Sequence, residues 1–309
     1  MNIFKKGSLR WLPFFAFWIA VVGVQPLYAM SAEDTETMHQ LERDAFGRLM
    51  AGVYVNGEGP FPFIVDTGAS RSVIYRSLTA LMDIEAVPFK SRSIITAGGY
   101  RRVQVFDVKD LFALGQTLEI EDTVALPDII GSHAKGLIGV DVLAGRTLLM
   151  KPLEDLAILL ARSDSLGNSA GWSHVQGRPV AYGSLALEVE IGGITIPLIV
   201  DTGASHTVIN SAGAEAIARS GIKEKEASAV IAGVRSSRQM VVPELTLGER
   251  RIGETELYVA DVPVFRMLGA GSVPAMILGM DILGDQDFAI DFKNWRLYLK
   301  EAHTEDELE

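Results

Sequence analysis

The chain contains one seven-residue segment twice. Residues 64–70 read Ile-Val-Asp-Thr-Gly-Ala-Ser, and the same seven residues return at 199–205, 135 positions later. The same offset relates residues outside the motif, such as Gly57 to Gly192 and Pro62 to Pro197. Self-similarity at a constant offset is the signature of a repeated structural unit. The sequence therefore predicts two copies of one lobe, which present Asp66 and Asp201 at the same place.

Each copy of the motif ends a predicted β-hairpin. In the first half, apolar runs lie on both sides of Asn56-Gly57, and Asn-Gly between apolar runs is a strong hairpin signal. The second half repeats this pattern around Gly192-Gly193. The second strand of each hairpin thus delivers its aspartate at its C-terminal end. Asp-Thr-Gly then turns the chain, since glycine adopts backbone angles that other residues avoid.

Two further hairpins are predicted around Gly98-Gly99 and around Gly233. Each half then has an apolar pair, a glycine and an acidic turn, which contains Asp141 or Asp281. Thirty glycines and twelve prolines suit many short strands joined by tight turns. We therefore predict an all-β fold of two lobes.

Composition shifts and the repeat divide the chain into six segments. They are 1–29, a signal peptide or membrane anchor; 30–46, a spacer or short prosegment; 47–160, the N-terminal lobe; 161–182, a linker rich in Ser, Gly and Asn; 183–300, the C-terminal lobe; and 301–309, an acidic tail. Within the second segment, residues 31–46 have apolar residues at helical spacing and are interpreted as a short helix or a spacer.

The N-terminus predicts an extracytoplasmic location. Lys5, Lys6 and Arg10 precede an uncharged run over 11–30, the pattern of a secretory signal peptide, which would leave the body periplasmic or secreted. The alternative is an uncleaved anchor associated with the membrane, because about 20 residues just span a bilayer. Both interpretations place the body outside the cytoplasmic membrane, since the basic end stays inside.

Composition excludes several classes of function. A net charge of −11 argues against nucleic acid as a partner. The absence of cysteine excludes disulfides, thiolate metal sites and thiol nucleophiles. None of the five histidines shows His-x-x-x-His spacing, so zinc hydrolysis has no support. We expect no metal and no cofactor.

Two carboxyl groups side by side can hydrolyse a peptide bond without a metal. Two copies of a lobe tend to pack about a pseudo-twofold axis, so equivalent residues near that axis become neighbours. If Asp66 and Asp201 are those residues, they share one proton and titrate as a pair. One carboxylate then accepts a proton from water, while the other donates to the carbonyl under attack.

The doubled Asp-Thr-Gly-Ala-Ser after an apolar strand, the Gly-bearing hairpins and the apolar-apolar-Gly turns resemble the retropepsin/pepsin clan of aspartic proteases. The similarity covers roughly residues 47–160 and 183–300. The duplication is similar to the two-lobed, single-chain arrangement of pepsin, whereas the local sequence around the motifs is more similar to that of retropepsins. The resemblance implies a pepsin-like architecture of retropepsin-like β-barrel lobes about a pseudo-twofold axis.

The resemblance implies roles for the motif residues. Asp66 and Asp201 become the catalytic dyad. The threonines that follow them interlock across the axis, the glycines offer backbone N–H groups to the carboxylates, and the serines are further partners. These supporting residues are Thr67, Gly68, Ser70, Thr202, Gly203 and Ser205. Ala69 and Ala204 stand where pepsins usually carry a hydroxyl, which implies a mildly acidic to near-neutral optimum.

The later hairpins of both halves would be flaps that pair with substrate as an added strand. The substrate-binding candidates in these flaps are Gly98, Gly99, Tyr100 and Gly233. For Tyr100, surface packing is an equal alternative. Arg235 and Arg238 in the second hairpin either stay solvated or pair with acids on a substrate.

The resemblance implies an aspartic endopeptidase that cleaves an extended protein or peptide segment, with apolar residues next to the cut, and acts as a monomer. One alternative is a catalytically silent scaffold that binds extended peptides or a partner protein. Another treats the halves as tandem units that each dimerise with a second chain. The short linker favours pairing within one chain.

Overall fold

The computed structural model describes residues 37–96, 98–161, 163, 166, 171–180, 183–231 and 234–300, within one compact unit that spans Asp34–Glu309. The predicted signal peptide or anchor, the acidic tail and the flap residue Gly233 lie outside the described residues. Within the described part of the chain, no helix is both long enough and apolar enough to span a bilayer.

The N-terminal lobe is built from short strands with three brief helical segments. In chain order these elements are β1 (Met38–Arg43), β2 (Leu49–Val55), β3 (Glu58–Val65), β4 (Val73–Tyr75), α1 (Arg76–Leu81), β5 (Ala86–Thr96), β6 (Gly99–Phe106), β7 (Asp110–Ala113), β8 (Gln116–Glu119), β9 (Ala125–Leu126), β10 (Gly136–Ile138), α2 (Val140–Leu143), β11 (Thr147–Lys151), a 3-10 turn at Pro152–Glu154 and β12 (Leu156–Leu160).

The C-terminal lobe repeats much of this order. Its elements are β13 (Trp172–Gln176), β14 (Arg178–Pro179), β15 (Leu185–Ile191), β16 (Ile194–Val200), β17 (Val208–Ile209), α4 (Ser211–Ala218), β18 (Glu224–Ile231), β19 (Val234–Val242), β20 (Leu245–Leu247), β21 (Arg250–Ile252), β22 (Thr255–Val259), α5 (Pro263–Met267), β23 (Met276–Leu278), α6 (Met280–Leu283), β24 (Phe288–Asp291) and β25 (Arg296–Lys300).

The hairpin that precedes each aspartate forms as the sequence predicts. β2 pairs with β3 across a turn in which Asn56 and Gly57 both have positive φ, the geometry that Asn-Gly favours. β15 and β16 pair in the same way across Gly192-Gly193. β2 and β15 share one burial pattern, in which alternate residues enter the core, as expected for a strand with one buried face.

A parallel strand lies beside each aspartate-bearing strand. β10 pairs with β3, and β23 pairs with β16, in equivalent register: Val65 lies opposite Ile138, and Val200 lies opposite Leu278. Because β3 lies between β2 and β10, and β16 lies between β15 and β23, each aspartate follows a strand that is paired on both sides. This arrangement places both motifs on rigid elements.

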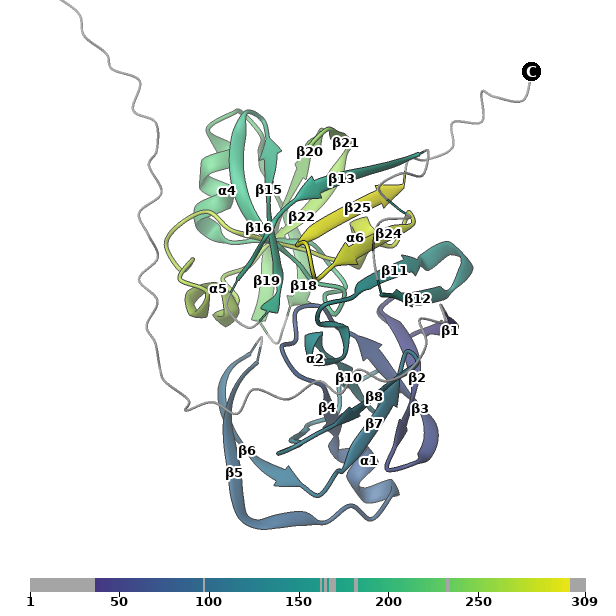
Figure 1. Cartoon of the computed structure of the whole chain (residues 1–309). Helices are drawn as coiled ribbons and strands as arrows, with labels where there is room; N and C mark the ends of the chain where they lie inside the picture. Colours follow the sequence, from purple (N-terminus) through teal and green to yellow (C-terminus); the bar gives the residue numbers. More distant parts are fainter. Residues whose placement is uncertain are drawn as a thin grey trace, which may run out of the picture. The chain divides into compact units, whose positions relative to one another are not determined.

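One sheet crosses from lobe to lobe. Within it the strand order is β13-β25-β24-β11-β12-β1, and β11 pairs antiparallel with β24 from Thr147 opposite Asp291 to Met150 opposite Phe288 (Figure 1). The largest hydrophobic cluster contains residues of both lobes, including Leu148 and Ile290. The two halves are therefore joined by a shared sheet and a shared core.

Two segments differ from expectation. The helix expected within 31–46 is wrong where the structure describes it, because 38–43 is strand β1, which pairs with β2 and β12. Residues 161–182 were expected to be a plain linker, yet β13 pairs with β25 and β14 with β15. Both segments are polar, and each gains hydrogen bonds from one strand that is distant in the sequence, β12 or β25, as well as from a nearby strand, β2 or β15. The other segment boundaries stay predictions.

Candidate active site

Asp66 and Asp201 occupy equivalent positions just after β3 and β16. The Asp66 N–H donates to the carbonyl of Ile138 at 2.9 Å, and the Asp201 N–H donates to that of Leu278 at 3.0 Å. Each aspartate is thereby fixed to the parallel strand beside its own. Both side chains are partly buried.

The two motif loops lie directly against each other. A Cβ atom added to Gly68 would lie 2.6 Å from the carboxyl carbon of Asp201, and one added to Gly203 would lie 2.4 Å from that of Asp66. Neither position can therefore carry a side chain without displacing the opposite carboxyl group. The two carboxyl groups are close enough for each to change the pKa of the other. The structure thus brings together the two aspartates that lie 135 residues apart.

Backbone N–H groups hold each carboxylate. The N–H groups of Gly68 and Ala69 donate to Asp66 Oδ1 at 2.9 and 3.0 Å. Those of Gly203 and Ala204 donate to Asp201 Oδ1 at 2.9 and 3.2 Å. The glycine donors are those the resemblance implied, whereas the alanine donors were not expected. A backbone donor leaves no trace in residue type, so sequence reasoning had no signal for them.

The serines of the motif do not play the part expected of them. Ser70 is exposed and Ser205 is partly exposed. Among the hydrogen bonds of the described residues, neither hydroxyl donates to a carboxylate of the pair. The alanine N–H groups donate instead, because the tight turn at Asp-Thr-Gly points the N–H groups of the glycine and of the alanine back at the carboxylate.

Thr67 and Thr202 interlock across the two lobes. The hydroxyl of each accepts the N–H of the other at 3.1 Å. The Thr67 hydroxyl also donates to the Val200 carbonyl at 3.0 Å, and that of Thr202 donates to the Val65 carbonyl at 2.6 Å. Both threonines are fully buried, so each bond is shielded from water. These four bonds fix the separation of the two loops.

A second pair of carboxylates supports the loops from behind. Asp141 accepts from the N–H and hydroxyl of Ser72, and Asp281 accepts from those of Thr207. The same hydroxyls accept the N–H groups that begin α2 and α6, at Gly139 and Gly279. Asp141 and Asp281 therefore serve at turns and helix starts, as expected. Ser72 and Thr207 were missed, although the 135-residue offset relates two hydroxyl residues there.

The environment of the pair favours protonation. Burial raises the pKa of Asp66, and the neighbouring Asp201 raises it further, against the opposing backbone hydrogen bonds. Burial also raises the pKa of Asp201, but its backbone donors, its hydrogen bond to Asp66 and the charge of Arg48 oppose that shift. Two neighbouring carboxyl groups titrate as a unit, so the pair retains a proton to higher pH than an isolated aspartate.

Arg48 makes the two lobes electrostatically unequal. Its guanidinium is buried and donates to the buried carboxylate of Asp44 through Nε at 2.9 Å. The position one repeat later is Gly183, so the C-terminal lobe has no equivalent cation there. Sequence reasoning missed Arg48 because nothing near it in the chain relates it to the motif.

Each lobe carries a hairpin after its motif. We call β5–β6, residues 86–106, the first flap, and β18–β19, residues 224–242, the second flap. The first flap forms a separate two-stranded sheet, and a Cβ added to its tip residue Gly99 would lie 3.9 Å from Pro263 Cβ of the other lobe. The first flap therefore reaches across to α5.

The flap candidates have different fates. Gly98 lies in the turn of the first flap, Gly99 begins β6, and Tyr100 beside them is 74% exposed. In the second flap, Arg238 pairs with Glu224, and its guanidinium also contacts Ser211. Arg235 is exposed.

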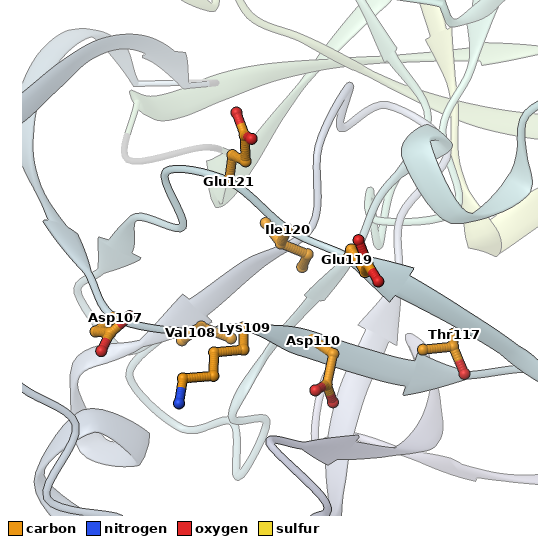
Figure 2. A pocket seen from close by; sticks show the side chains of 8 residues that line it. All are labelled: Asp107, Val108, Lys109, Asp110, Thr117, Glu119, Ile120 and Glu121. Carbon is orange, nitrogen blue, oxygen red and sulfur yellow. The ribbon is translucent and has the colours of Figure 1, made fainter. Parts of the chain in front are cut away.

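One pocket lies away from the aspartates. Figure 2 shows its side chains, which come from β7, β8 and the residues next to these strands. It is lined by Asp107, Val108, Lys109, Asp110, Thr117, Glu119, Ile120 and Glu121. No group of three or more His, Asp or Glu side chains among the described residues could hold a metal ion.

Two equivalent lobes that meet at one aspartate each define the two-lobed, pepsin-like class of aspartic proteases. A family model described as aspartyl protease matches residues 51–142 and 187–282, once in each lobe and together more than half of the chain. The chain belongs to the aspartyl protease family.

Comparison with solved structures supports the fold. The crystal structure of aspartic proteinase from Irpex lacteus is similar with a TM-score of 0.55 over 88% of this chain and 99% of that chain, at 14% sequence identity. A search of curated proteins gives no match. The protein is thus an all-β, two-lobed member of the family with a pepsin-like fold.

Proposed function

We propose that this protein is an aspartic endopeptidase whose catalytic residues are Asp66 and Asp201. The observation that carries the proposal is the contact of the two motif loops, in which each carboxyl group lies against the glycine of the opposite loop. Membership of the aspartyl protease family supports it. The interlocked threonines support it further, because they hold the carboxyl groups in a fixed relation.

The proposed chemistry needs only one proton on the pair. A water molecule between the carboxyl groups gives a proton to the ionised carboxylate and attacks the peptide carbonyl, while the protonated carboxyl group donates to the carbonyl oxygen. Collapse of the tetrahedral intermediate then returns a proton to the leaving amine. The four backbone N–H donors stabilise the ionised form, and burial keeps the remaining proton in place.

We propose an extended segment of a protein or peptide as the substrate. β5 lies in a two-stranded sheet and β18 lies at the end of a ten-stranded sheet, so each flap offers a strand edge to which an extended chain can pair. Apolar residues next to the cut follow from the family resemblance. The location outside the cytoplasmic membrane, with a cleaved signal or an anchor, stays a proposal drawn from residues 1–29.

The test is cleavage of a mixed peptide library between about pH 3 and pH 8, a range that brackets the titration of a carboxyl pair. Asp66→Asn and Asp201→Asn are assayed beside the natural chain, with and without pepstatin. We expect a bell-shaped pH profile and loss of about a thousandfold or more in either variant. Substantial activity in one Asn variant would contradict a shared pair.

The rival proposal is a scaffold that binds extended peptides without cleaving them. Folded protein that retains peptides at every pH but releases no fragments would favour it. Circular dichroism spectra that match between the natural chain and the Asn variants establish that a lack of cleavage is not caused by a failure to fold.

A further inference from the structure

The first flap is strongly basic in an acidic protein. Residues 86–106 contain Lys90, Arg92, Arg101 and Arg102 and no aspartate or glutamate, whereas the whole chain has a net charge of −11. The second flap mixes both signs, with Glu224 and Glu226 beside its cations. The positive charge is therefore a property of one flap and not of the repeat.

Two of the four cations share one carboxylate at the base of the flap. Lys90 and Arg92 both form ion pairs with Asp122, whose side chain is 11% exposed. These contacts tie β5 to the segment before β9. Arg102 donates through Nε to the hydroxyl of Ser91 at 2.8 Å, a contact within the hairpin. Arg101 is exposed and has neither an ion pair nor a hydrogen bond from its side chain to any described residue.

Strand register places Arg101 on the face that looks toward its own lobe. Residues directly opposite in an antiparallel pair share a face, and Arg101 lies opposite Ile94. Ile94 packs against the cluster of Val73, Val103, Val105 and Val124 on that lobe. Arg102 lies opposite Ser93 and therefore belongs to the other face.

The hydrophobic cluster beneath this face contacts β10, the strand that is hydrogen-bonded to Asp66. The cluster under the flap also includes Leu137 of β10. The next residue, Ile138, accepts the N–H of Asp66. Arg101 is also only two residues from Gly99, where the flap approaches Pro263 of the other lobe. A guanidinium with no partner in the described part of the chain thus lies on the inner face near the tip of the flap.

We propose that Arg101 is a specificity-determining residue that binds an acidic side chain of the substrate, close to but not at the scissile bond. This inference rests on the proposed peptidase function. The planar guanidinium matches a carboxylate in two-point geometry, and it makes this contact without breaking an ion pair of the free protein. Lys90 and Arg92 cannot serve in this way while Asp122 holds them.

The test compares matched peptides that differ only by Glu or Gln at one position within about four residues of a cut found with the natural chain. We expect kcat/KM to favour the best Glu peptide by about fivefold at low ionic strength, mainly through KM. In Arg101→Gln the Glu-to-Gln ratio falls to about one, and in Arg101→Glu a Lys peptide is favoured instead. About 1 M salt reduces the natural ratio, since charges are then screened within about 3 Å.

Arg102→Gln is the matched control, because it removes an equal charge one residue away on the other face. We expect it to keep the natural Glu-to-Gln ratio. An equal fall of the Glu-to-Gln ratio in both variants would show that the preference comes from the net charge of the flap, and it would overturn the assignment to Arg101. Absence of any Glu preference in the natural chain, or its survival in Arg101→Gln, would also overturn it.

A binding measurement separates this inference from the proposed function. Fluorescence anisotropy with labelled Glu and Gln peptides is measured on Asp201→Asn and on the double variant with Arg101→Gln. If the natural chain cleaves nothing but Arg101 still controls the affinity for Glu, the peptidase proposal fails and acidic recognition stands. If neither peptide binds or is cleaved, acidic recognition is rejected too.

Discussion

At the residue scale, the most demanding positions are glycines. Gly68 and Gly203 leave room for the opposite carboxyl group, and their N–H groups hold the carboxylate of their own lobe. The threonines before them prevent the loops from moving apart, because their hydroxyls are bonded across the lobes. A close approach fixed from both sides tolerates no added atom.

We therefore predict that Gly68→Ala lowers the free energy of unfolding by about 1–3 kcal/mol, the usual cost of overpacking, and lowers peptide cleavage at least a hundredfold. Urea unfolding and the library assay measure the two effects. Gly253→Ala is the control, since a Cβ there meets nothing within 4 Å. Equal behaviour of the two variants would mean that the loops can separate.

The raised pKa values of the pair give a pH-dependent stability. Burial raises the folded-state pKa of Asp66 and Asp201 above that of an unfolded aspartate, about 3.9, so above this pH the folded protein holds more protons than the unfolded chain does. The pair consequently lowers stability progressively above about pH 4. We predict that Asp66→Asn is more stable than the natural chain at pH 7 and that the difference disappears at acidic pH.

Thermal unfolding of both proteins across the pH range measures this effect. Asp83→Asn serves as the matched control, because Asp83 is exposed and lies outside the pair. A natural chain that is more stable than Asp66→Asn at neutral pH would show that hydrogen bonds to the carboxylates outweigh their burial.

At the scale of elements, β1 bears on the status of the N-terminal segment. It lies between β2 and β12, and Leu41 in its middle is 4% exposed and belongs to the main core. A segment integrated in this way cannot leave without opening the sheet. The structure thus argues against removal of the chain as far as residue 46, which the prosegment hypothesis included.

We predict that a chain starting at Asp44 is less stable than one starting at Thr37 by about 2–5 kcal/mol, the range for removal of a buried leucine. Urea denaturation of the two truncated proteins is the measurement. Coincident midpoints would show that β1 contributes little and would revive the prosegment hypothesis.

At the scale of the whole molecule, the two halves complete one another. β11 pairs with β24, and the threonines exchange hydrogen bonds within one chain. Tandem units that each dimerised with a second chain would have to use these same surfaces, which are already paired within one chain. We predict that activity per molecule stays constant on hundredfold dilution, as measured by peptide cleavage with light scattering of the same samples. A decline with dilution would instead indicate pairing between chains.

The sequence allowed prediction of those parts of the site that depend on side chains in a local pattern. Asp66, Asp201, the threonines and the glycines were all identified because the motif occurs twice after equivalent hairpins. The Ala69 and Ala204 donors could not be identified, because they act through the backbone. Arg48 was missed because its effect on Asp201 acts across the fold and not along the chain.

The sequence alone determined the duplication, the hairpins that present the aspartates and the two flaps, because alternation and turn residues act over a few neighbouring positions. Only the tertiary structure decided that β1 and β13 are strands and that the lobes share a sheet through β11 and β24. It also decided that Arg101, alone of the first flap's cations, lacks a partner among the described residues. Strand register places this residue on the inner face of the flap. The reason is physical: pairing of distant strands and charges supplies energy that no local stretch of sequence contains.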